Sequence, residues 1–108
     1  MNKLLTIISC LIVLTACDAP KLGALPTDAV ILAFGDSLTS GVGARKNKSY
    51  PAVLAQLTGL QVINAGIAGE TTAQGLKRLS QVRDQSSPDI VILIEGRNDI
   101  LKGLHLAQ

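Results

Sequence analysis

Three short segments of the chain combine glycine with a small polar side chain in a way that could do chemistry. They are 35–38 (Gly-Asp-Ser-Leu), 64–69 (Asn-Ala-Gly-Ile-Ala-Gly) and 96–99 (Gly-Arg-Asn-Asp). Glycine lets backbone N–H groups approach a ligand closely. A serine hydroxyl can attack a carbonyl when a base takes its proton, and glycine and asparagine N–H groups can stabilise the negative charge that develops. Brought together, the three segments would supply parts of a serine nucleophile with an oxyanion hole.

The residues around these segments predict alternating strands and helices. Apolar runs at 29–34 and 90–94 are typical of strands buried on both faces, and 61–64 predicts a shorter strand. One helix is expected to open at Ser49-Tyr50-Pro51 and close at Thr58-Gly59. A second helix begins at Thr71 or Thr72 and ends before 86–89, and its apolar positions recur at helical spacing at Leu76, Leu79 and Val82.

This order of elements predicts an α/β fold, in which a parallel sheet is connected by crossover helices. Because such crossovers are right-handed, the loops after all three strands are expected to lie at the carboxyl edge of one sheet. Open α/β proteins place their ligand sites at that edge. The three polar segments are therefore predicted to share one site.

Length and composition exclude several other classes of protein. The chain has 108 residues, which fits one small domain. Its net charge is +2, and its sequence contains no basic cluster of the kind that binds nucleic acid. Phe34 and Tyr50 are the only aromatic residues, too few for base stacking. Gly41-Val42-Gly43 is followed by Lys46 where a dinucleotide motif needs its third glycine. One histidine and no cysteine pair in the mature chain cannot build a zinc site, so no metal or cofactor is expected.

The first residues predict an export signal. The uncharged run at 4–16 is shorter than the roughly twenty residues that span a bilayer, and it follows a short basic start. The sequence Leu-Thr-Ala-Cys at 14–17 resembles the lipobox of bacterial lipoproteins, whose cysteine is acylated. The resemblance implies a signal peptide at 1–16, a lipid anchor on Cys17, a tether at 17–28 and a domain at 29–108. An ordinary secretory signal is the alternative.

The lipobox resemblance also implies a location. A lipidated Cys17 would hold the domain at the membrane of the bacterial cell envelope, facing the periplasm. Asp18 directly after that cysteine slightly favours the inner membrane.

Together, the three polar segments resemble the conserved blocks of the SGNH, or GDSL-type, hydrolase family, in its bacterial periplasmic thioesterase, lysophospholipase and arylesterase branch. The matching blocks are 34–41, 64–72 and 96–99. The resemblance implies a three-layer, flavodoxin-like fold with Ser37 as nucleophile and with Gly69 and Asn98 as oxyanion-hole donors. Outside these roles, we expect Asp36 and Asp99 to support their turns and Asn64 to tie loops together. Glu70 and Glu95 are expected to be solvated or to lie at the rim.

One departure from the family pattern concerns the general base. The family's Asp-x-x-His block is missing, and the only histidine, His105, has Lys102 three positions before it. The resemblance therefore implies the N-terminal portion of a larger fold, truncated after the third strand, with 90–94 unpaired on one edge. We expect an ester or thioester hydrolase with little activity from these residues alone, acting on a small acyl substrate. The alternative is a non-catalytic, lipid-anchored binding module.

Overall fold

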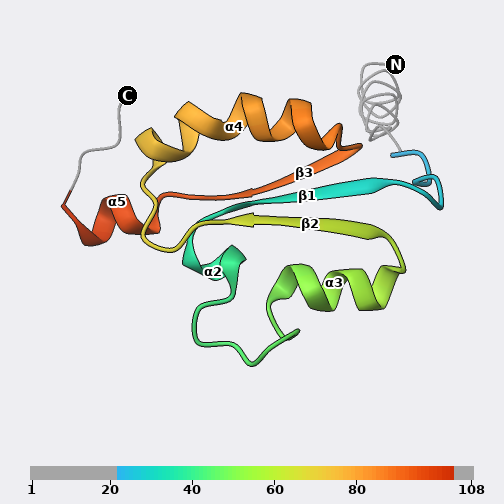
Figure 1. The fold of residues 1–108 in the computed structure, drawn as a ribbon, viewed down its shortest axis with the longest axis horizontal. Helices are drawn as coiled ribbons and strands as arrows, with labels where there is room; N and C mark the ends of the chain where they lie inside the picture. The colour runs from blue at the N-terminus through green and yellow to red at the C-terminus, as the bar shows by residue number, and fades with distance from the viewer. Residues whose placement is uncertain (1–21, 104–108) are drawn as a thin grey trace, which may run out of the picture.

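The computed structural model describes residues 22–103, which form a three-stranded parallel sheet flanked by helices (Figure 1). The predicted alternation of strands and helices is confirmed. One short helix, which begins at Ser37, was not predicted, and the second strand extends two residues past the expected 61–64. The elements are β1 (Val30–Gly35), α2 (Ser37–Ser40), α3 (Tyr50–Thr58), β2 (Gln61–Gly66), α4 (Thr72–Ser86), β3 (Ile90–Ile94) and α5 (Arg97–Leu101).

The strand order is β2-β1-β3, and both pairings are parallel. Gly35 at the end of β1 lies opposite both Gly66 of β2 and Ile94 of β3, so the three strands end at the same level. Helix α4 covers one face of the sheet, whereas α2 and α3 lie on the other (Figure 1). The strand order therefore switches sides after β2, because β2 and β3 lie on opposite sides of β1. Such a topological switch point, here between β1 and β3, is where open α/β sheets bind ligands.

The core is centred on β1. Its residues from Ile31 to Phe34 are buried, because β1 has a strand on each side and helices above and below. The expectation that 90–94 is equally buried is wrong. β3 is an edge of the described sheet, and Leu93 is 58% exposed. On α4 the expected apolar face is also incomplete, since Leu76 is exposed while Leu79 and Val82 are half-buried.

Several predictions concern residues outside the described range. The signal peptide at 1–16, the lipidation site Cys17 and the histidine His105 all lie there. The described part of the tether, 22–28, is exposed and contains no helix or strand. Between residues 22 and 103, no helix is both long enough and apolar enough to span a membrane.

Candidate active site

The first corner of the site follows β1. Asp36 is fully buried and caps α2, because its Oδ1 accepts a hydrogen bond from the Leu38 backbone N–H at 2.9 Å. Ser37 is the first residue of this helix and is half-buried. The turn that presents the serine is therefore held by the carboxylate just before it.

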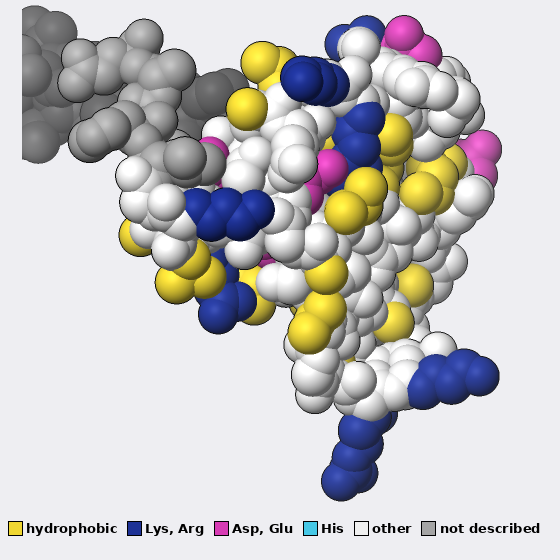
Figure 2. All heavy atoms as spheres, turned by 60° about the vertical axis from the view of Figure 1, so that its left-hand side comes forward, with side chains coloured by type: hydrophobic (Ala, Val, Ile, Leu, Met, Phe, Trp, Pro, Cys, Tyr) yellow, Lys and Arg dark blue, Asp and Glu magenta, His cyan; other side chains and the backbone are white. Residues whose placement is uncertain are grey.

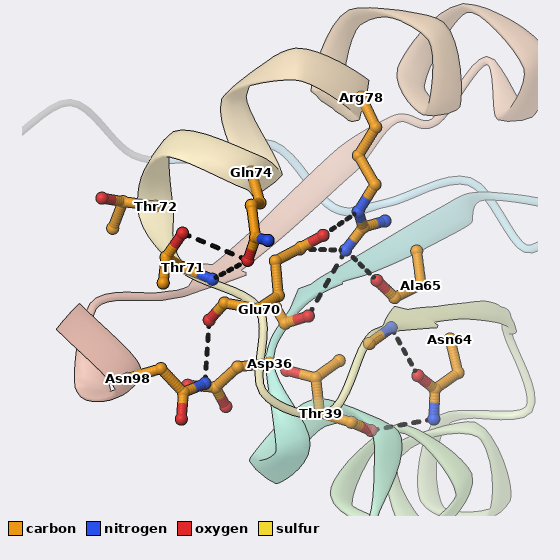
Figure 3. A network of polar contacts seen from close by, with 12 residues as sticks. Asp36, Thr39, Asn64, Ala65, Glu70, Thr71, Thr72, Gln74, Arg78 and Asn98 are labelled. Atoms are coloured by element: carbon orange, nitrogen blue, oxygen red, sulfur yellow. Dashed lines mark hydrogen bonds and ion pairs between the residues drawn. The ribbon is translucent and has the colours of Figure 1, made fainter. Parts of the chain in front are cut away.

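The second corner begins where β2 packs directly against α2. Asn64 donates from Nδ2 to the Thr39 carbonyl at 2.8 Å, and its Oδ1 accepts from the Gly66 N–H at 3.0 Å (Figure 3). A Cβ at Gly66 would overlap the backbone of Thr39 and Ser40, so only glycine allows this approach. Asn64 thereby joins the end of β2 to the helix that begins with Ser37.

Gly69 lies further along the same loop, at a φ of +79°, a left-handed conformation that favours glycine. It borders a polar hollow of about 270 Å³, and its carbonyl accepts a hydrogen bond from Lys102 Nζ at 3.2 Å. The hollow is lined by Ile67, Ala68, Gly69, Glu70, Gln74 and Lys102. Neither Ser37 nor Asn98 is among these lining residues.

The third corner follows β3 and is bonded to the second. Asn98 donates from Nδ2 to the Glu70 carbonyl at 2.8 Å (Figure 3). Asp99 is buried and accepts from the Thr72 backbone N–H at 3.0 Å and from its hydroxyl at 2.8 Å. These hydrogen bonds lower the pKa of the Asp99 carboxyl below its ordinary value. Asp99 therefore supports the start of α4 and not its own helix, whose N-cap is Gly96.

Backbone hydrogen bonds connect the corners across the strand ends. The Ile67 N–H donates to the Gly35 carbonyl at 2.9 Å, and the Asp36 N–H donates to the Ile94 carbonyl at 3.3 Å. The structure thus joins the three segments at one edge of the sheet. Within the described range, however, no hydrogen bond links the Ser37 side chain to Gly69 or Asn98.

A buried charge cluster lies beside these corners, and sequence reasoning missed it. Of the two positions expected for Glu70 and Glu95, solvated or at a rim, the solvated one is wrong, because Glu70 is only 5% exposed and both Glu95 side-chain oxygens are buried. Arg78 on α4 pairs with Glu70 at 2.5 Å, and this hydrogen-bonded partner lowers the pKa of the Glu70 carboxyl. Glu95 has no hydrogen-bond partner among the described residues.

Burial, and then the nearby Glu70 carboxylate, raises the pKa of Glu95 to about 7. The sequence did contain one signal for this cluster, the glycine inside helix α4. A Cβ at Gly75 would stand 3.3 Å from Glu70 Oε1, Glu95 Oε1 and Phe34 Cε1, so glycine lets the helix approach the two carboxyl groups.

The end of the molecule that carries α5 and the strand ends comes forward in Figure 2. Lys and Arg side chains stand apart from one another there, with hydrophobic side chains between them, and acidic side chains are visible both in a central hollow and at the outline. This face therefore presents a mixed surface and not a single charged patch. Across residues 22–103, no three His, Cys, Asp or Glu side chains gather as a metal site would require.

Comparison with known proteins places the chain in a family. Residues 33–108 match the GDSL-like lipase/acylhydrolase family. The chain belongs to this family. It is 41% identical over 78 residues to an arylesterase of Vibrio mimicus, an alignment that covers 68% of this chain and 39% of the relative. It is 36% identical over 80 residues to the thioesterase 1/protease 1/lysophospholipase L1 of Escherichia coli K12, covering 72% and 38%.

A solved structure shows the same fold. The SGNH-hydrolase family esterase AlinE4 is 44% identical, with a TM-score of 0.66 over 76% of this chain and 47% of that one. The predicted SGNH hydrolase fold with its parallel sheet is thereby confirmed. The chain spans about two fifths of the length of the curated relatives that it matches.

Proposed function

We propose that the whole protein hydrolyses carboxylic esters or thioesters of small acyl substrates through an acyl-serine intermediate on Ser37. The hydroxyl oxygen attacks the carbonyl carbon, and the leaving alcohol or thiol departs before water releases the acid. The N–H groups of Ser37 and Gly69 and the amide of Asn98 would receive the negative charge on the carbonyl oxygen. Family membership and the names of the relatives, an arylesterase and a thioesterase, support this class of reaction.

The observation that carries the proposal is the hydrogen bond from Asn98 Nδ2 to the Glu70 carbonyl at 2.8 Å. It ties the corner after β3 to the residue that follows Gly69. An amide nitrogen carries two hydrogens, so one N–H holds this contact and the second is left for a ligand oxygen. The contact orients the Asn98 side chain before substrate arrives, and such preorganisation is what makes an oxyanion donor effective.

Residues 22–103 contain no histidine that could act as the general base. A serine hydroxyl is a weak nucleophile unless a neighbouring base takes its proton. The single histidine, His105, lies outside the described residues. We therefore propose that the 108 residues by themselves reach at most the residual level of about 10³–10⁴-fold over water seen when a triad member is missing.

The test uses p-nitrophenyl butyrate hydrolysis and labelling by a fluorophosphonate probe, both on the whole protein. Ser37→Ala should abolish both signals, and Asn98→Ala should lower kcat about 10²–10³-fold, because one oxyanion donor is worth that much. Ser80→Ala, at an exposed serine of α4, is the matched control and should keep both signals. If the folded whole protein shows neither turnover nor labelling, the non-catalytic binding module replaces this proposal.

We also propose that the protein is anchored in the bacterial cell envelope through lipidated Cys17, with the domain facing the periplasm and the inner membrane favoured. The Leu-Thr-Ala-Cys sequence at 14–17 supports this, and two or more acyl chains on one residue give stable anchoring. Metabolic labelling with an alkyne fatty acid should mark the wild type and not Cys17→Ala. Labelling that is equal in the two proteins would contradict the anchor.

A further inference from the structure

One arginine contacts several of the elements that build the proposed oxyanion hole. Arg78 donates from Nε to Glu70 Oε2 at 2.6 Å and from Nη2 to Glu70 Oε1 at 2.5 Å, a two-pronged pair (Figure 3). The same Nη2 donates to the Ala65 carbonyl at 2.8 Å and reaches the Gly35 carbonyl at 3.4 Å. A side chain from α4 therefore holds the ends of β1 and β2 and the loop between β2 and α4.

The guanidinium is also fixed from its flat side. Its central carbon lies 3.9 Å from the centroid of the Phe34 ring on β1, within the range of a cation–π contact. The planar fork of arginine can bind a carboxylate with two N–H groups and still stack on an aromatic face, which lysine cannot do. The position of the group is thus set in three directions by residues of the sheet and the loop.

The cluster acts on the proposed site through Glu70. Its side chain is held by Arg78, and its carbonyl accepts the hydrogen bond from Asn98 Nδ2. Gly69, the proposed backbone donor, directly precedes it. A shift of Glu70 would therefore move two of the proposed oxyanion donors at once.

Stability alone explains this arrangement poorly. Removing two opposite charges from water costs about as much as their attraction returns, so a buried ion pair adds little over well-packed apolar side chains. What such a pair does supply is direction, because both hydrogen-bonding partners must occupy set positions.

We propose that Arg78 is a positioning residue for ester hydrolysis, which holds Glu70 so that Gly69 and Asn98 face the same point. The inference rests on the proposed function and adds to it a residue outside the three matching blocks. Arg78 does not touch the substrate, so its loss should affect the rate of the chemical step more than substrate binding.

The test compares three variants of the whole protein: Arg78→Met, Arg78→Lys and the control Arg83→Met. Arg83 lies on the same helix, but its ion pair with Asp84 is exposed, so its loss should change nothing at the site. We expect Arg78→Met to lower kcat about 10²-fold with little change in KM, as a displacement of about 1 Å can do. Arg78→Lys should recover part of that loss, because it restores the charge but not the fork.

A second measurement does not depend on catalysis. Amide hydrogen exchange at Ile67 and Glu70 should be at least about tenfold faster in Arg78→Met than in the wild type or Arg83→Met, while the amides of β1 stay protected. An inactive wild type with this exchange pattern would overturn the proposed function but would still show that Arg78 holds the loop around Glu70. Unchanged exchange in a folded Arg78→Met overturns the inference, as does a kcat within twofold of the wild type.

Discussion

Strands β1 and β3 have almost the same apolar character but opposite surroundings. Leu32 of β1 is fully buried, whereas Leu93 of β3 is 58% exposed. The difference comes from strand order, because β1 is the central strand and β3 is an edge of the described sheet. The comparison teaches that an apolar run identifies a strand but does not reveal how many of its faces and edges are covered.

Several polar residues are more deeply buried than the apolar residues of β3. At the carboxyl ends of the strands, Asp36, Thr39, Glu70 and Asp99 are buried and hydrogen-bonded. Next to these residues, an open groove of about 140 Å³ is formed by α4, β1 and β3 and is lined mostly by apolar side chains, among them Leu76 and Leu93. The best-packed part of the described residues is therefore the polar corner region together with β1, and the predictions below test that division.

The largest effect is expected from the core of the central strand. Leu32→Ala should destabilise the fold by about 2–5 kcal/mol, because it leaves a cavity in a packed interior. Leu93→Ala on β3 should cost less than about 1 kcal/mol, since the side chain is already largely in contact with water. Urea unfolding of the two variants, both made in the 108-residue chain, measures both values. Equal losses would show that β3 is covered as fully as β1.

A smaller loss is expected where β2 meets α2. Gly66→Ala places a methyl group against the backbone of Thr39 and Ser40, and overpacking of this kind costs about 1–3 kcal/mol. Gly23→Ala is the control, because nothing lies within 4 Å of a Cβ there. Thermal melts followed by circular dichroism compare them. An unchanged Tm for Gly66→Ala would mean that the backbone of α2 can shift to accommodate the methyl group at little cost in stability.

The hydrogen bond between Thr72 and Asp99 should contribute less. Thr72→Val keeps the shape and removes the hydroxyl, and losing a hydrogen bond to a carboxylate costs about 1–2 kcal/mol. Thr58→Val removes an exposed hydroxyl that donates to the Leu54 carbonyl and accepts from the Leu60 N–H; water can replace both contacts, so its effect should be smaller. The difference in urea midpoints reports the link between α4 and α5. No difference would place that link outside the best-packed region.

A further test is the pH dependence of the charge cluster. Glu95 faces Glu70, Asp36 and Arg78, and its pKa of about 7 lies above the ordinary 4.5. Its stabilising contribution is therefore complete below pH 4.5 and is lost as the pH rises through 7. Glu70 has the opposite dependence: its lowered pKa contributes stability above pH 4.5 that is lost as the pH falls through that lowered value.

Glu95→Gln removes the decline between about pH 5 and 8 and leaves the loss at acid pH. The urea midpoint, measured from pH 4 to pH 9 in the wild type and the variant, checks this. Asp84→Asn, at an exposed carboxylate of α4, is the control and should keep the wild-type slope. A slope that persists in Glu95→Gln would assign the titration to another group.

Much of the fold could be predicted because its signals are local. The apolar runs, Pro51 near the start of α3 and the glycines that end α3 and β2 depend on nearby residues alone, and the elements follow them within about two residues. The three polar corners could also be foreseen at one edge, since the handedness of the crossovers leaves no other place for them. The short helix α2 could not be predicted, because its four residues are too few to show a periodic apolar pattern.

The sequence by itself determined the order of strands and helices, the family and the three loops that carry Ser37, Gly69 and Asn98. The family resemblance had already implied an unpaired edge at 90–94, but only the tertiary structure showed that the side chains of β3 are exposed in the described residues and that Glu70 and Glu95 are buried. The role of Arg78 also came from the structure, because its hydrogen-bonding partners lie up to 43 positions away in the chain. Periodicity reports a residue's chain neighbours, whereas burial and charge pairing depend on residues that folding brings together from distant parts of the chain.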